Sequence, residues 1–151
     1  MQIHASCAAR DGAGVLLLGP PGSGKSDLVL RLLDRGFTLV ADDRVVIEDG
    51  HASAPAALAG LLEVRGLGIL RLPYLERAEL ALAVTLGGAV PRLPAPDVAL
   101  GLPVLGLPVL AVDAARPAAP QIVELALDCA LGRLAQHAGA FAAGCAAELP
   151  R

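Results

Sequence analysis

Aromatic residues, basic clusters and paired cysteines are all scarce in this chain. Phe, Tyr and Trp make up only 2% of its 151 residues, so the core must be built from aliphatic side chains. The formal net charge is −3, and no segment gathers lysines and arginines, which argues against a large nucleic-acid-binding surface. Cys7, Cys129 and Cys145 are odd in number and widely spaced, a pattern typical of reduced thiols in a cytoplasmic protein rather than of a disulfide framework.

Long apolar runs and targeting segments are missing as well. The longest stretch without a charged residue runs from Val98 to Val112. It is shorter than the roughly 20 residues that a membrane-spanning helix needs, and Pro103 and Pro108 interrupt it. We expect buried strands with turns there, and no membrane segment. Residues 1–12 do not combine a basic start with an apolar run, so the sequence also predicts no signal peptide.

The overall balance of residues is typical of one folded domain. Hydrophobic residues account for 55% of the sequence and charged residues for 18%, which favours a packed core over disorder. A length of 151 residues fits a single domain that spans residues 1–151. Strand and helix patterns follow one another along the chain, so the expected fold class is α/β, with a mixed sheet and an early hairpin.

The apolar pattern of the first half predicts strands, a hairpin turn and a helix. Short apolar runs indicate the strands, and Asp11-Gly12 is a hairpin turn signal between the first two. Apolar residues from Leu28 to Leu33 have helical spacing, and Gly36 ends that helix. The expected segments are strands at Ile3–Ala9, Gly14–Leu18 and Phe37–Ala41, and a helix at Ser26–Gly36.

Shorter strands and loops are expected in the second half of the chain. An extended segment at Arg44–Glu48 is followed by a turn at Asp49-Gly50 and by an Ala- and Pro-rich loop from Ala52 to Gly60. The other expected elements are strands at Leu61–Val64, at Glu79–Leu86, near Val104-Leu105 and at Leu110–Val112, a loop at Pro91–Asp97, and an amphipathic helix at about Gln121–Gln136.

The single lysine of the chain, Lys25, follows a glycine-rich turn in the stretch GPPGSGKS. This stretch fits the phosphate-loop pattern G-x-x-x-x-G-K-[ST], and the expected strand before it and helix after it are the context that the pattern requires. Its glycines permit backbone angles that turn successive N–H groups toward a phosphate, while the helix N-terminus faces the same anion. The sequence therefore predicts a site for a nucleoside triphosphate with Mg²⁺. Its residues are Gly19, Pro20, Pro21, Gly22, Ser23, Gly24, Lys25, which reaches the β- and γ-phosphates, and Ser26, whose hydroxyl is a metal ligand.

Two carboxylates, Asp42 and Asp43, come directly after the strand Phe37–Ala41. If that strand lies beside the one that feeds the glycine loop, both acids emerge at the sheet edge where ligands of α/β folds collect. On an extended segment the two side chains point in opposite directions, so one can serve Mg²⁺ while the other faces the hydroxyl of an acceptor. A solvated turn after a strand is the alternative interpretation of this pair.

Four pieces of the sequence occur in an order that resembles the catalytic domain of bacterial HPr kinase/phosphorylase. They are His4, GPPGSGKS, LVADDRV from Leu39 to Val45, and LEVRGLGIL from Leu62 to Leu70. The last piece is the most discriminating, because a phosphate loop alone marks a very large group of proteins. The resemblance covers about Ile3 to Leu72 and implies a phosphate-loop fold related to HPr kinase and PEP carboxykinase. It also implies the short form of the family, typical of alphaproteobacteria, without a separate N-terminal domain.

The resemblance implies a protein-serine kinase that uses ATP and Mg²⁺ to phosphorylate HPr, the small phosphocarrier of the phosphotransferase system. Asp43 matches the proton acceptor for the substrate serine, and Asp42 supports it. His4 matches an active-site histidine, Glu63 a second Mg²⁺ ligand, and Arg92 an active-site arginine. The family assembles through this domain, which implies a homo-oligomer, a hexamer. No nucleic acid or membrane partner is expected.

Simpler interpretations exist for some of these residues. His4 alone is more often a packed strand histidine, and Glu63 and Arg65 share a strand face on which they can form an ion pair. Asp27 stands where the family usually has a glutamate, and the family's basic loop tied to dephosphorylation is represented by Ala111 to Pro120, in which only Arg116-Pro117 matches. We therefore expect the kinase reaction and leave the phosphorylase reaction open. Because the glycine loop also resembles that of adenylate kinase, a nucleotide or small-molecule kinase and a non-catalytic ATP sensor are the alternatives.

Overall fold

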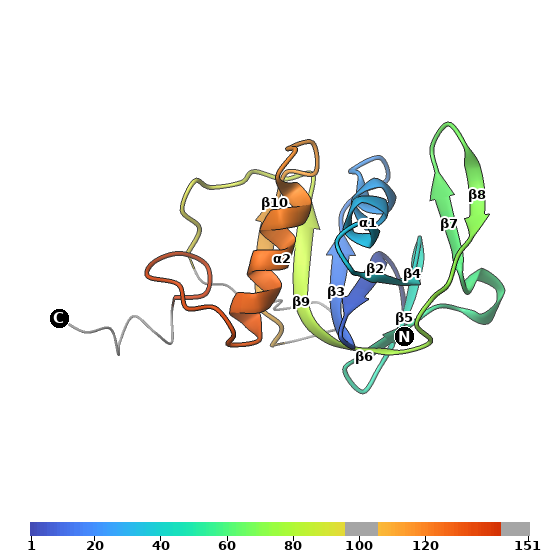
Figure 1. Cartoon of the computed structure of the whole chain (residues 1–151), viewed down its shortest axis with the longest axis horizontal. Coiled ribbons are helices and arrows are strands. Elements are labelled where there is room, and N and C mark those ends of the chain that lie inside the picture. Colours follow the sequence, from blue (N-terminus) through green and yellow to red (C-terminus); the bar gives the residue numbers. More distant parts are fainter. Residues whose placement is uncertain (96–105, 143–151) are drawn as a thin grey trace.

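A mixed sheet of eight strands forms the centre of the molecule, and the helices α1 and α2 pack on one of its faces (Figure 1). The computed structural model describes residues 1–95 and 106–142. The strand order is β1-β5-β6-β9-β3-β2-β4, and β10 pairs with β9. This architecture confirms the predicted α/β fold with a mixed sheet. The strands of the sheet are β1 (Gln2–His4), β2 (Ser6–Arg10), β3 (Ala13–Leu18), β4 (Thr38–Ala41), β5 (Arg44–Glu48), β6 (His51–Ser53), β9 (Ala78–Leu86) and β10 (Val109–Val112).

A tight hairpin joins β2 to β3 and places β3 inside the sheet. Its turn residues Asp11 and Gly12 have φ angles of 52° and 80°, the left-handed conformation that two-residue hairpin loops require. On its other side β3 runs parallel to β9, which in turn runs parallel to β10. The predicted hairpin is confirmed, and the strand that feeds the glycine loop is central rather than at an edge.

Helix α1 (Lys25–Leu33) starts directly after the glycine loop. It is shorter at its C-terminal end than the predicted Ser26–Gly36, because the chain leaves the helix at Asp34 and turns at Gly36, where φ is 85°. Its buried residues are those that gave the helical spacing in the sequence, namely Leu28, Val29 and Leu32. The apolar stripe of α1 therefore faces the sheet as its periodicity predicts.

Helix α2 (Ala119–Ala130) is shifted toward the N-terminus relative to the predicted Gln121–Gln136. Pro120 belongs to its first turn, where a missing N–H costs no helical hydrogen bond. The helix stops before Gly132, which has a φ of 75°. Apolar residues continue beyond this point, so the hydrophobic pattern extended the prediction further than the backbone permits.

The first predicted strand, Ile3–Ala9, is two strands in the structure. Ala5 separates β1, which pairs antiparallel with β5, from β2, which pairs antiparallel with β3 and β4. The two halves of this segment thus have different neighbours. His4 ends β1, and Ser6 begins β2.

Two strands occur where the sequence predicted a loop or an unassigned segment. β6 takes up the start of the predicted loop Ala52–Gly60 and pairs antiparallel with β5 and β9, and a short 3₁₀ turn, η1 (Ala56–Leu58), follows it. β8 (Gly68–Arg71) pairs with β7 (Leu61–Val64) in a separate two-stranded hairpin. Both segments have weak intrinsic strand preference, so their neighbours decide their conformation.

The remaining expectations for the second half are met only in part. Residues 79–86 lie in β9 and residues 110–112 in β10, as predicted. The short strand predicted near Val104-Leu105, and the end of the loop predicted at Pro91–Asp97, lie outside the described residues. None of the helices within the described ranges has the length and apolar character needed to cross a bilayer.

Aliphatic side chains cover both faces of the sheet. Because side chains alternate along a strand, Val15 and Leu17 of β3 pack with the two helices, whereas Leu16 packs with side chains from β4 to β6 on the opposite face. Phe37 is a buried aromatic residue of the helix-covered face. Small residues such as Ala8 and Ala9 let the central strands be covered closely on both sides.

Cys7, on β2, provides a test of this packing. The residue is fully buried, and burial raises the pKa of its thiol from 9.0 to about 12. In the unfolded chain the thiol ionises near its ordinary value, so above about pH 9 the unfolded state loses this proton first and the folded state loses stability. We predict that the free energy of unfolding falls between pH 8 and pH 10 more steeply in the wild type than in Cys7→Ala. The excess slope reaches up to about 1.4 kcal/mol per pH unit in urea denaturation. Identical slopes would contradict the burial of an ionisable thiol at this position.

Candidate active site

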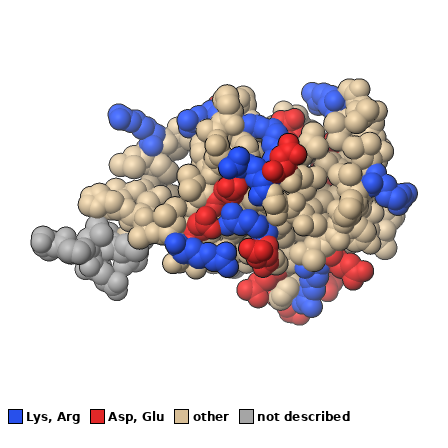
Figure 2. Space-filling model, viewed as in Figure 1, with Lys and Arg blue, Asp and Glu red and all other residues tan. Residues whose placement is uncertain are grey.

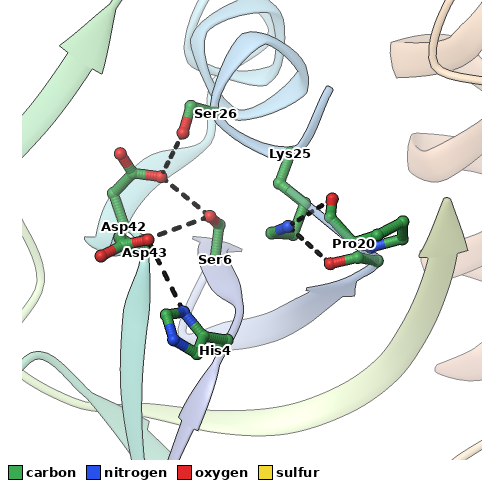
Figure 3. Close-up of polar contacts among 8 residues, drawn as sticks. His4, Ser6, Pro20, Lys25, Ser26, Asp42 and Asp43 are labelled. Atoms are coloured by element: carbon green, nitrogen blue, oxygen red, sulfur yellow. Dashed lines mark hydrogen bonds and ion pairs between the residues drawn. The ribbon is translucent and has the colours of Figure 1, made fainter. Parts of the chain in front are cut away.

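The glycine loop connects the end of β3 to the start of α1 at one edge of the sheet (Figure 1). Gly22 and Gly24 have φ angles of 81° and 97°, which are the left-handed conformations predicted for them. The Lys25 ammonium donates to the backbone carbonyl oxygens of Gly19 at 2.6 Å and Pro20 at 3.1 Å (Figure 3). The lysine is therefore held over the loop beside the N-terminus of α1, where backbone N–H groups favour an anion.

Gly19 is required for a different reason from the other loop glycines. A Cβ atom at this position would lie 2.6 Å from Ser23 Oγ and 2.8 Å from the carbonyl oxygen of Leu86. These distances are shorter than van der Waals contact, so a larger residue would force the loop away from the end of β9. The first glycine of the motif thus fixes how closely the loop packs on the sheet.

Asp42, the residue directly after β4, is a nearly buried carboxylate that joins three elements. Its Oδ1 accepts hydrogen bonds from the Ser26 hydroxyl at 2.7 Å and the Ser6 hydroxyl at 2.8 Å (Figure 3). Its Oδ2 accepts from the backbone N–H of Glu63 at 3.3 Å. Only 6% of Asp42 is exposed. Because a buried carboxylate needs hydrogen-bond donors, α1, β2 and β7 are tied to this one side chain.

The sheet order corrects one expectation about the acidic pair. β4 does not lie beside β3, because β2 runs between them and pairs with both. Since β3 and β4 are each antiparallel to β2, they run in the same direction, and their carboxyl ends lie on the same side of the sheet. The acids therefore do arrive next to the glycine loop, but one strand further away than predicted.

Asp43 has a conformation that the sequence did not predict. Its φ is 69°, so the chain turns at this residue instead of continuing in the extended form that was expected. The side chain is 71% exposed, and its Oδ1 lies 3.8 Å from His4 Nδ1 (Figure 3). The backbone N–H of Asp43 donates to Ser6 Oγ at 3.5 Å. The two carboxylates accordingly have different surroundings: Asp42 is hydrogen-bonded inside the protein, and Asp43 is open to solvent.

A cavity of about 590 Å³ brings the loop, Asp43 and the β7–β8 hairpin together. One wall comes from the glycine loop and α1, and the opposite wall comes from the hairpin. Its lining residues are Ser6, Pro21, Gly22, Gly24, Lys25, Ser26, Asp27, Leu30, Asp43, Glu63, Val64 and Arg65. The loop and the predicted acid Asp43 thus share one cavity, with Asp42 buried directly behind it.

Two residues predicted for the site lie outside the lining of the cavity. His4 approaches Asp43 but is not a lining residue of the cavity, and Arg92 lies exposed in the loop after β9, also outside the lining. Sequence reasoning missed Ser6, whose hydroxyl contacts both acids. The signal for it was weak, since Ser6 is a single small polar residue at the start of a short strand and belongs to no motif.

The oxygen atoms at the cavity suit Mg²⁺ when phosphates accompany it. Ser26 Oγ and Asp42 Oδ1 lie 2.7 Å apart, and both are the hard oxygen donors that Mg²⁺ prefers. Among the described residues, no three or more His, Cys, Asp or Glu side chains form a group with metal-binding geometry. This donor set fits an ion that keeps waters and shares its ligands with a substrate, rather than one enclosed by protein side chains.

Acidic and basic side chains are interspersed on the face that Figure 2 shows, without a broad patch of one sign. Several charged side chains of the described residues are paired, including Arg35 with Glu124 and Arg31 with Asp27.

Comparison with known proteins identifies the family. Residues 1–75 match the model of the HPr Serine kinase C-terminal domain. These residues belong to the HPr serine kinase family. The segment includes the glycine loop, both acids and the β7–β8 hairpin, so the resemblance noted for Ile3 to Leu72 is confirmed.

Relatives and a solved structure agree with this assignment. HPr kinase/phosphorylase of Clostridium tetani is 42% identical over 78 residues, which make up 49% of this chain and 26% of that protein. The enzyme of the same name from Bordetella pertussis is 50% identical over 66 residues, or 39% of this chain and 21% of that protein. The structure of the HPr(Ser) kinase/phosphatase from Coxiella burnetii matches with a TM-score of 0.67 and 26% identity, covering 83% of this chain and 92% of that one. The chain spans about a quarter of the length of these curated relatives, while its fold follows the solved structure almost throughout.

The two adjacent acids, Asp42 and Asp43, should differ sharply in their effect on stability. Asp42→Ala leaves the Ser6 hydroxyl and the Glu63 amide without their shared acceptor, so we predict a loss of about 2 kcal/mol in the free energy of unfolding. Asp43→Ala removes an exposed side chain and should change it by less than about 0.5 kcal/mol. Urea denaturation of both variants at neutral pH measures the difference. Equal losses would show that Asp42 does not hold the three elements together.

Proposed function

We propose that this domain transfers the γ-phosphoryl group of ATP to a serine hydroxyl of an HPr-type phosphocarrier protein. The observation that carries the proposal is the hydrogen bond between Ser26, at the end of the glycine loop, and Asp42, because it joins the phosphate-binding element to the acidic pair. Asp43 lines the cavity next to both. The names of the relatives, HPr kinase/phosphorylase, and the family of residues 1–75 support the same substrate class.

The glycine loop binds the triphosphate in this proposal. Backbone N–H groups of Gly22 to Ser26 surround the β-phosphate, and the N-terminus of α1 faces the same negative charge. Lys25, now hydrogen-bonded to two loop carbonyls, exchanges them for β- and γ-phosphate oxygens. Positioning and charge neutralisation are the main sources of rate enhancement in this proposal.

Ser26 and Asp42 would hold Mg²⁺ at this site, with Glu63 as a candidate ligand from the opposite wall of the cavity. When bound, the ion neutralises charge on the phosphate oxygens. The sequence predicted Ser26 and Glu63 as the metal ligands, and the geometry favours Asp42 over Glu63 as the partner of Ser26. Asp42, rather than Glu63, contacts the serine of the loop directly, and Glu63 takes part through its backbone N–H.

Asp43 accepts the proton of the acceptor serine in our proposal. It is the exposed member of the acidic pair, so a hydroxyl on another protein can reach it. His4 lies close enough to orient the Asp43 carboxylate, and the Ser6 hydroxyl bonds to its backbone. The acceptor oxygen then stands between Asp43 and the γ-phosphate, as in-line transfer requires.

A protein acceptor is also supported by the surface around the cavity. The β7–β8 hairpin stands apart from the main sheet (Figure 1), and its Leu67 and Ile69 side chains are 71% and 70% exposed. Glu63, Val64 and Arg65 of the same hairpin line the cavity. Apolar side chains that border a reactive site favour contact with a macromolecule over binding of a small polar substrate alone.

We further propose a cytoplasmic homo-oligomer, by analogy with the family.

Incubation of the protein with ATP, Mg²⁺ and HPr of the same organism tests the proposed function. We predict that a phosphoserine forms on HPr, which mass spectrometry locates. Asp43→Asn should retain ATP binding, since it leaves the glycine loop unchanged, and lower the transfer rate by at least about 100-fold. Normal transfer by this variant would exclude the proton-acceptor role. Phosphorylation of AMP but not of HPr would instead assign the protein to the small-molecule kinases. Addition of inorganic phosphate to phosphorylated HPr and the protein then tests the reverse reaction.

Lys25→Ala should weaken nucleotide binding and transfer together. The variant removes the only side-chain cation of the glycine loop, so we predict at least a tenfold rise in the dissociation constant for ATP with Mg²⁺, roughly 1.4 kcal/mol. Isothermal titration calorimetry measures it. Unchanged affinity would mean that the triphosphate does not bind at this loop.

A further inference from the structure

Arg31, on the outer side of α1, binds a turn that is distant in the sequence. Its guanidinium donates to the backbone carbonyl oxygens of Ala114 at 2.6 Å and Arg116 at 2.7 Å. The Asp27 carboxylate, one helical turn earlier, lies 3.5 Å from the same guanidinium. The planar fork of arginine can hold two carbonyls at once, which a lysine cannot do with the same geometry.

The turn that Arg31 binds, residues 113–116, is well formed. It follows β10, and the backbone N–H of Arg116 donates to the carbonyl of Asp113 at 3.1 Å. The Asp113 side chain also accepts from the backbone N–H of Ala115 at 2.9 Å. Such Asx-type bonding gives the turn a defined shape. These hydrogen bonds give the turn a fixed conformation, so Arg31 can hold it as a unit.

The same turn abuts the glycine loop. A Cβ atom built on Gly24 would lie 3.0 Å from the Cβ of Ala114, closer than almost all real contacts of that kind. Gly24 is the N-cap residue of α1, with a φ of 97°, and precedes Lys25. The Ala114 methyl group thus supports the loop from outside at the point where the N–H groups proposed to hold phosphate begin.

Arg35 gives a matched comparison one helical turn later. It lies just beyond the end of α1 and also reaches toward the second half of the chain, but it pairs with the Glu124 side chain of α2, at 2.8 Å. That pair joins the two helices and does not contact the turn or the glycine loop. If bridging the two halves of the chain were all that mattered, both arginines would have the same effect.

We propose that Arg31 is a positioning residue for the phosphate site: it clamps the Asp113–Arg116 turn so that Ala114 holds Gly24 in its left-handed conformation. Arg31 itself does not line the cavity. It lies 3.5 Å from Asp27, which does, and we assign its effect to Ala114 because the turn is the segment that meets Gly24. Its role in nucleotide affinity rests on the proposed function. Its role in ordering the glycine loop does not, because that role concerns contacts within this chain alone.

Hydrogen exchange of the protein without nucleotide tests the clamp directly. The informative amides are hydrogen-bonded ones: Ser23 and Leu28, which donate to the carbonyls of Pro20 and Gly24, and Ala115 and Arg116, which donate to Asp113. In Arg31→Met these amides should exchange about tenfold faster than in the wild type. Arg31→Lys, which keeps the charge but not the fork, should give an intermediate rate, and Arg35→Met should leave them unchanged. Unchanged exchange at Ser23 and Leu28 in Arg31→Met would overturn the proposal, even if the turn itself exchanges faster.

A titration with ATP and Mg²⁺ tests the consequence for binding. Arg31→Met should raise the dissociation constant about fivefold and Arg31→Lys less, with Arg35→Met at the wild-type value. Ala114→Gly removes the methyl group that contacts Gly24 while keeping the Arg31 bonds, and it should weaken binding similarly. Because both changes act at one contact, the double variant Arg31→Met/Ala114→Gly should show less than the sum of the two effects. Full additivity, or a loss confined to thermal stability, would overturn the proposal.

The two experiments separate the inference from the proposed function. If the wild type binds no ATP, the proposed function fails, and the exchange rates still decide whether Arg31 orders the loop. If the wild type binds ATP and Arg31→Met binds it equally well, the proposed function stands and the positioning role of Arg31 fails.

Discussion

The Asp42 carboxylate is the interaction on which the site depends. It is nearly buried at the end of β4, and donors from β2, α1 and β7 surround it. A buried carboxylate is costly unless its oxygen atoms are hydrogen-bonded, so these three elements are held to the positions that satisfy it. Each donor belongs to part of the site. Ser26 ends the glycine loop, Ser6 accepts the backbone N–H of Asp43, and Glu63 lies in the β7–β8 hairpin. The arrangement of the candidate site therefore follows from the need to satisfy one buried charge.

The sheet sets the direction of the strands that lead to the site, and the turns after them set the positions of the site residues. Because β3 and β4 both run antiparallel to β2, their carboxyl ends meet at the same edge although they are not neighbours. At that edge the chain leaves β3 through the glycine loop and leaves β4 through the left-handed residue Asp43. Backbone angles that are unfavourable for most residues thus occur where the chemistry is proposed. The hydrogen bond from the Asp43 amide to Ser6 helps to hold this conformation.

Among the residues that the structure describes, the C-terminal half packs beside the site and supplies none of the lining residues of the cavity. β10 and α2 complete the helix-covered core, and the turn between them packs against Gly24. Matches to the family model end at residue 75, yet the structural likeness to the HPr(Ser) kinase/phosphatase of Coxiella burnetii covers 83% of the chain. The structural likeness thus extends beyond the residues that the family model matches.

Much of the fold and of the candidate site follows from the sequence alone. The strand, loop and helix around GPPGSGKS, the Asp11-Gly12 hairpin and the position of the acidic pair are local patterns, and local patterns are set by backbone geometry and hydrophobic periodicity. The predicted loop was wrong at its start, because the pairing of β6 with its neighbours makes that segment a strand. The predicted final helix was wrong at its end, because α2 stops before a glycine turn despite an apolar continuation. Only the tertiary structure decided that β2 separates β3 from β4, that Ser6 joins the two acids, that Arg92 lies away from the cavity, and that Arg31 reaches the turn at Ala114. These outcomes depend on contacts between segments distant in the chain, and no pattern within a short window of sequence records which distant segment a strand edge or an arginine will meet.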